Sequence, residues 1–151
     1  MSDAEELQGV QRRRSSLYHA TLGLEAALSS PTGNLARWQD RALAASLALH
    51  DAIVAHVADS ERPGEFLDSI TTRAPHLIAA AKRLIDEHEV LVSSADELVR
   101  QVKSIDTTAD ASIADNIRDH ALELMGRLVR HRQRGTDLVY AAYGEDLGSS
   151  G

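Results

Sequence analysis

Histidine is the residue type in this sequence that can do the most chemistry, because its imidazole binds metals and exchanges protons near neutral pH. Three of the seven histidines, His56, His88 and His131, fall in apolar stripes of helical period, where Leu or Ala would pack better. A buried imidazole that lacks hydrogen-bond partners costs about 1–3 kcal/mol. These histidines are therefore either satisfied locally, one by one, or meet in one layer, where they would suit a single Zn, Fe or Cu ion.

The elements that position these histidines are predicted to be helices. Apolar residues recur at steps of three and four, and the sequence shows no convincing strand. Asn34 is a plausible N-cap, Pro63-Gly64 breaks the second helix, Pro75 suits a first helical position and Gly144 suits a helix stop. The predicted helices cover residues 3–28, 35–61, 75–103 and 110–143, with a short helical turn at 65–72 and a loose tail after 146.

Four long helices joined by short loops predict an all-α fold, a single up-down-up-down antiparallel four-helix bundle over residues 1–151. Nearly symmetric turns pair residues at equal distances from each loop. If the 65–72 segment continues the second helix, His56 lies level with His88, and His131 lies about 9 Å away along the axis. If that helix ends at Glu61, His56 lies closer to His131. At least two of the three histidines should share a layer.

The other histidines are weaker candidates for a site. His19 lies beside its stripe and about 18 Å from His56 by the helix rise. His76 follows the start of a helix and should be exposed, whereas His50 and His120 flank their seams. No Ser or Thr is placed by spacing beside a histidine with an orienting acid, and no GxSxG or phosphate loop occurs. Nucleophilic catalysis, and an enzyme in general, is therefore not favoured.

Composition narrows the function further. The chain has 151 residues and no cysteine, which excludes disulfides and thiolate metal sites. A net charge of -7 opposes binding to nucleic acid and to anionic membranes. No run of 18 apolar residues predicts a membrane span, and the acidic N-terminus does not resemble a signal peptide. A cytoplasmic location is the expectation.

The histidines and their neighbours resemble the hemerythrin-like, or HHE cation-binding, four-helix-bundle family. That family carries a ligand histidine on each helix, carboxylates four residues after the histidines of helices 2 and 4, and an acidic residue on either side of the helix 3 histidine. The stretches that carry the resemblance are Tyr18-His19-Ala20-Thr21-Leu22, His56-Val57-Ala58-Asp59, Glu87-His88-Glu89 and His131-Arg132-Gln133-Arg134. The resemblance implies a protein that binds a metal ion, iron or zinc, or a small ligand, as an oxygen- or redox-linked sensor or binding protein.

The sequence departs from the family at both bridging carboxylate positions, which are Ser60 and Gly135 here. A di-iron centre needs carboxylates to offset its charge, so a reduced, mononuclear histidine site is the expectation. Glu61, Glu87 or Asp59 could substitute only by turning inward. Gly135 is explained either by close helix approach or by a polar pocket next to Arg14.

The competing hypothesis is a metal-free bundle that acts as an interaction or regulatory module. Its contact face would be an exposed apolar stripe, which would equally serve a homodimer or another protein partner. The residues of that stripe are Leu43, Leu47, Val54 and Val57.

Overall fold

The structure is a computed structural model. It describes residues 3–62 and 66–149, and the side chains of residues 16–62 and 67–143. Over these residues every regular element is helical, without a strand. The elements are α1 (Asp3–Leu28), α2 (Leu35–Ser60), α3 (Phe66–Arg73), the 3₁₀ turn η1 (Pro75–Leu77), α4 (Ile78–Lys103) and α5 (Ser112–Ser149).

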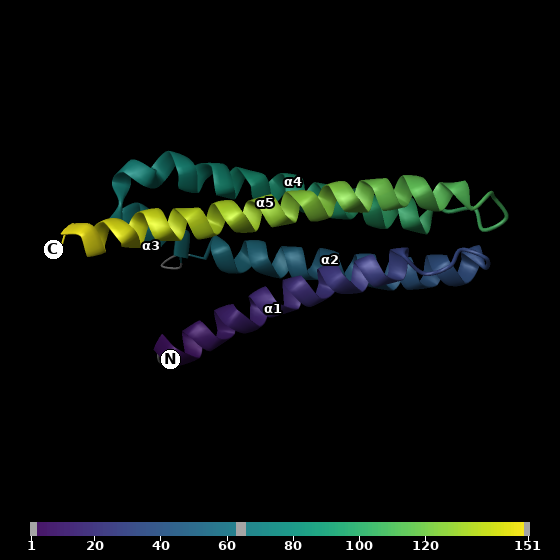
Figure 1. Ribbon diagram of the computed structural model, residues 1–151, viewed down its shortest axis with the longest axis horizontal. Helices are drawn as coiled ribbons and strands as arrows, with labels where there is room; N and C mark the ends of the chain where they lie inside the picture. The colour runs from purple at the N-terminus through teal and green to yellow at the C-terminus, as the bar shows by residue number, and fades with distance from the viewer. Residues whose placement is uncertain (1–2, 63–65, 150–151) are drawn as a thin grey trace.

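Successive long helices run in alternate directions along the long axis of the molecule (Figure 1). Helix α2 packs against both α1 and α4, and α4 packs against α5. Helix α1 lies along α2 near the 29–34 loop and diverges from it toward its N-terminus, as Figure 1 shows. The short helix α3 packs on α4 and α5 at the end of the molecule where the chain finishes.

Most predicted helix ends agree with the structure, and local chemistry explains them. The side chain of Asn34 accepts a hydrogen bond from the Arg37 backbone N–H at 3.0 Å, as an N-cap does. Pro75 occupies the first position of η1, ahead of α4. The predicted break at Pro63-Gly64 lies outside the described residues.

Both ends of α5 differ from the prediction. The helix begins at Ser112 instead of residue 110, because Asp110 accepts a hydrogen bond from the Ser112 backbone N–H at 3.1 Å and ends the loop there. In the same loop, hydrogen bonds from the Thr108 hydroxyl and backbone N–H hold the pKa of Asp106 below its ordinary value. At its other end α5 passes through Gly144 to Ser149. A helical glycine costs about 1 kcal/mol against alanine, which weakens a helix without ending it.

The core consists of two apolar clusters. The larger cluster includes Ile53, Leu91 and Leu128, and the smaller one, near α3, includes Leu84 and Leu138. Along α4 and α5, one seam position of each helix between these clusters is a buried histidine. The bundle therefore has one polar layer between two apolar ones.

The junction of α1 and α2 is closed by side chains that reach the last carbonyls of α1. The Trp38 indole N–H and the Arg118 guanidinium both donate to the Leu28 carbonyl, at 3.4 Å and 2.7 Å. These bonds satisfy a helix-end acceptor that has no partner within α1. The Arg118 guanidinium also lies over the Trp38 ring, 5.7 Å from its centroid, so α5 is tied to the same corner.

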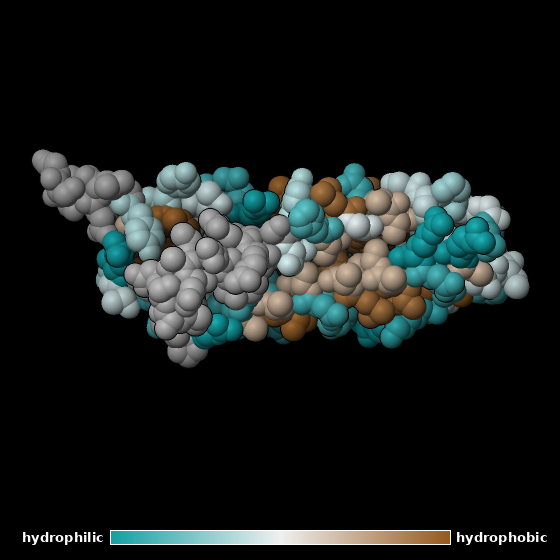
Figure 2. Space-filling view, turned by 90° about the horizontal axis from the view of Figure 1, so that it is seen from below, coloured by the Kyte–Doolittle hydropathy of each residue, from teal (hydrophilic) through white to brown (hydrophobic). Residues whose placement is uncertain are grey.

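Helix α2 is the one described helix that is long and apolar enough, by length and composition, to cross a membrane. Core helices of soluble proteins have the same property, and α2 here packs between α1 and α4. Exposed apolar side chains occur on α1 and α2, and Figure 2, which views the side on which these helices lie, shows apolar residues gathered across its middle. The exposed ones are Tyr18, Leu22, Leu47 and Val54.

Candidate metal centre

The three seam histidines come from three different helices. His56 lies in the last turns of α2, His88 in the middle of α4 and His131 in α5. Each continues an apolar stripe: His88 follows Ala81 and Leu84, and all three of these residues are buried. Because the helices are amphipathic, the periodicity that buries the leucines also turns the imidazoles inward.

The structure brings all three histidines into one layer. Their ring centroids lie 5.5 Å apart for His56 and His88, 5.4 Å for His56 and His131, and 4.9 Å for His88 and His131. One ring nitrogen from each lies within 4.8 Å of the other two. The heights along the bundle axis that the sequence predicts left open whether His56 lies nearer to His88 or to His131. The three nearly equal ring distances show that it sits close to both.

Two carboxylates hold the imidazoles from outside. Glu61 Oε1 lies 3.0 Å from His88 Nδ1, and Glu87 Oε2 lies 2.6 Å from His131 Nδ1. Arg134 forms an ion pair with the other oxygen of Glu87. An ionised carboxylate can only accept, so each Nδ1 carries the proton and each Nε2 of this pair is left as an acceptor.

The inner nitrogens are the atoms available to a metal ion. His56 Nε2 and His131 Nε2 lie 3.3 Å apart. Tetrahedral Zn–N bonds of about 2.0–2.1 Å place two ligand nitrogens roughly 3.3 Å apart, so this pair already has the required spacing. A three-histidine set leaves one position open for water or another small ligand.

Burial also favours the neutral imidazole that a metal requires. His131 is only 7% exposed. Burial lowers the pKa of His131, against the opposing hydrogen bond and charge of Glu87. A neutral His131 with its proton held on Nδ1 is the form that ligates through Nε2.

The weaker candidates do not join the inner layer. His19 is exposed and its ring contacts Tyr18. Glu61 and Glu87 contact the histidines through Nδ1, so they orient the imidazoles instead of replacing the missing bridging carboxylates. Asp59 pairs with Arg62 at 3.1 Å.

The two departures from the family pattern lie one helical turn from the cluster. The Ser60 hydroxyl donates to the His56 backbone carbonyl at 2.8 Å. Among the described atoms, a Cβ placed on Gly135 would meet none within 4 Å, so close approach of a described part of the bundle does not explain this glycine. The side chain of Arg14, expected nearby, lies outside the described residues.

Two of the remaining histidines, His50 and His120, link helices away from this layer. His50 Nε2 on α2 lies 2.6 Å from Asp96 Oδ1 on α4, and His120 on α5 bonds Ser94 and Gln101 on α4. His76 is exposed, as predicted. The contact between His120 and a serine was missed, because the two residues belong to different helices and no sequence spacing relates them.

No protein-family model matches the chain, and neither does any curated protein or solved structure. The geometry of the histidine layer is therefore the basis for assigning a function.

Proposed function

We propose that this protein is a hemerythrin-like metal-binding bundle in which His56, His88 and His131 hold a single ion. The observation that supports the proposal is the convergence of three imidazole nitrogens within 4.8 Å, from three helices that are far apart in the sequence. The hydrogen bonds of His88 to Glu61 and of His131 to Glu87 do not require His56 in the same layer. The alternating directions of α1, α2, α4 and α5 support the up-down-up-down topology that this family implies.

The surroundings of the cluster suit a divalent ion. Glu61 and Glu87 place two negative charges just outside the imidazoles, which offsets the charge of the ion. Ser60 and Gly135 supply no carboxylate, so these two positions give no inner bridge for a second ion. Imidazole ligands suit both zinc and iron(II).

A bound ion would supply Lewis acidity, or redox chemistry if it is iron, at an open coordination position. The chain's own groups do three things around it. Glu61 and Glu87 keep the protons on the outer nitrogens, the apolar clusters lie on both sides of the layer, and no described atom within 4 Å of a Cβ on Gly135 would obstruct a small ligand such as dioxygen. We therefore favour a binding or sensing role over a catalytic one.

The alternative is a metal-free interaction module, and one observation favours it. Leu47 and Val54 on α2 are 39% and 43% exposed, which fits the predicted contact stripe. The other two members fit less well, since Leu43 and Val57 pack partly against the core. Metal binding and a protein contact on this stripe would involve different faces of α2.

Titration with Co(II), followed by visible absorption, tests the proposal. Co(II) in a tetrahedral histidine site should give intense d–d bands that saturate at one equivalent. His88→Ala should abolish these bands, whereas His76→Ala, which removes an exposed histidine, should leave them unchanged. Bands that are absent in the wild type, or that survive in His88→Ala, would contradict the proposal and favour the interaction module.

A further inference from the structure

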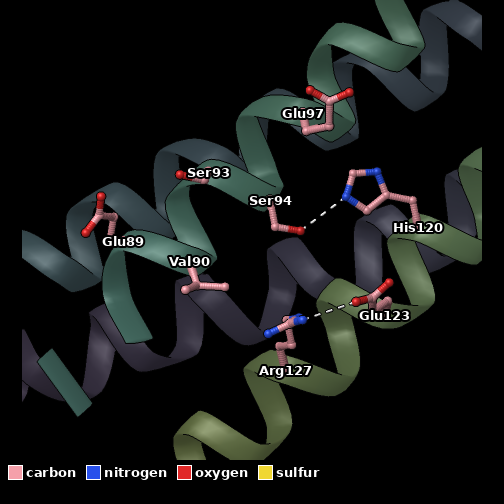
Figure 3. Close-up of a pocket in the computed structure, with 8 residues that line it drawn as sticks. All are labelled: Glu89, Val90, Ser93, Ser94, Glu97, His120, Glu123 and Arg127. Carbon is pink, nitrogen blue, oxygen red and sulfur yellow. Dashed lines mark hydrogen bonds and ion pairs between the residues drawn. The ribbon is translucent and has the colours of Figure 1, made fainter. Parts of the chain in front are cut away.

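A second constellation lies on the outer face between α4 and α5. A groove of about 470 Å³ is formed there, with Ser94, His120 and Arg127 among the residues that line it. Figure 3 shows Ser94 and His120 pointing toward each other across the groove. None of the three clustered histidines lines it, so the groove is separate from the candidate metal centre.

Within this groove a histidine is held between a hydroxyl and an amide oxygen. His120 Nε2 lies 3.1 Å from Ser94 Oγ, and His120 Nδ1 lies 2.8 Å from Gln101 Oε1. Ser94 and Gln101 are seven residues apart on α4, which is two helical turns and places them on one face. All three side chains are half-buried, so they are accessible and yet held in place.

The hydrogen-bond pattern selects one tautomer of His120. Gln101 Oε1 can only accept, so Nδ1 carries the proton. Nε2 is then an acceptor, and the Ser94 hydroxyl donates to it. A nucleophile bonded to a base, with the base oriented by a third group, is the arrangement that activates serine for acyl transfer.

We propose that Ser94 is a nucleophile activated by His120, and that it accepts the acyl group of small activated esters. Ser94 Oγ bonds to the ester carbonyl carbon while its proton passes to His120 Nε2. The bond from carbon to the leaving oxygen then breaks, and that oxygen takes the proton from His120. Water, activated by the same base, releases the acyl group as a carboxylic acid and restores Ser94. Gln101 is a positioning residue, because it acts only through His120.

The charges in the groove define the class of ester. Glu89, Glu97 and Glu123 line it and disfavour anionic acyl groups, so neutral or cationic esters are the expected substrates. Arg127 is the cation among the lining residues, and Figure 3 shows its guanidinium paired with Glu123, at 3.2 Å. As the cation of the lining, it is the group whose charge can offset negative charge that develops on the carbonyl oxygen.

The test is acetylation by p-nitrophenyl acetate, followed by nitrophenolate release and by peptide mass spectrometry. The reaction is run with chelator present, so that any bound metal is removed and its fate does not affect the result. In samples quenched with acid during the reaction, before water releases the acyl group, the wild type should carry one acetyl group on Ser94. Ser94→Ala should lose it, while Ser29→Ala, which removes an exposed hydroxyl outside the groove, should react at the wild-type rate.

The role of the base is tested with two further positions. His120→Ala should slow acetylation of Ser94 by about 10²-fold or more, the contribution expected of a positioned base. Gln101→Met should also slow the acetylation of Ser94. Gln101→Glu keeps an acceptor oxygen, so this variant should be acetylated at about the wild-type rate. Circular dichroism checks that each variant is folded. A wild-type protein that is acetylated only elsewhere, or a Ser94 that reacts equally fast without His120, would overturn the proposal.

Discussion

Replacing Glu87 probes how much the outer carboxylates contribute to metal binding. Glu87 is 26% exposed, and its Oε2 accepts from His131 Nδ1 at 2.6 Å, a short charge-assisted hydrogen bond. Loss of such an outer partner lowers metal affinity about 10–100-fold, which corresponds to about 1.4–2.7 kcal/mol. Glu87→Gln keeps an acceptor oxygen and removes the charge, so about tenfold is expected. Glu87→Ala removes both and should approach 100-fold.

The assay is competition for Zn(II) against a chromogenic chelator. Glu89→Gln is the matched control, since Glu89 is an exposed carboxylate on the other side of His88 and lines the outer groove. It should bind Zn(II) within about twofold of the wild type, because charges exposed to water interact weakly at high dielectric and salt screens them further. Wild-type affinity in Glu87→Ala, or an equal loss in Glu89→Gln, would refute the role assigned to Glu87.

Three further predictions concern stability, each measured by chemical denaturation of the metal-free protein. Burial lowers the folded-state pKa of His131 below 6.5, so the unfolded chain binds more protons than the folded one. The free energy of unfolding should therefore stay constant above pH 6.5 and fall as the pH drops through the folded-state pKa. In His131→Asn this fall should be smaller. Leu124 is fully buried, so Leu124→Ala should cost about 2–5 kcal/mol, whereas Leu122→Ala, at a position 63% exposed, should stay within about 0.5 kcal/mol. Gly135→Ala should stabilise by roughly 0.5–1 kcal/mol, because the added Cβ meets no atom within 4 Å; destabilisation would show that this space is filled.

Helix positions could be predicted from the sequence because the local signals agree with one another. The seam of α4 through Leu84, His88 and Leu91 is buried as its periodicity indicates. Predictions of helix ends failed where they rested on a single residue. Gly144 suited a helix stop, yet the residues after it continue α5 to Ser149. A glycine marks a C-terminus only when the residues that follow leave the helix.

The candidate site was only partly predictable, for reasons of rotation and reach. The inward orientation of His56, His88 and His131 follows from helical periodicity, but their common level depends on the segment between α2 and α4, where η1 and α3 set the register. Glu87 lies one residue, or about 100° of rotation, from the seam, and it reaches His131 because α5 packs beside it. That packing is a tertiary property that no spacing along the chain encodes.

Metal content measured on protein purified without an affinity tag tests the central claim most directly. Elemental analysis is made before and after incubation with Fe(II) or Zn(II) and removal of the excess. We expect about one ion per chain after incubation in the wild type and in His76→Ala, and none in a folded His88→Ala variant. Protein that retains no ion under either condition, or a His88→Ala variant that retains as much as the wild type, would contradict the three-histidine metal site.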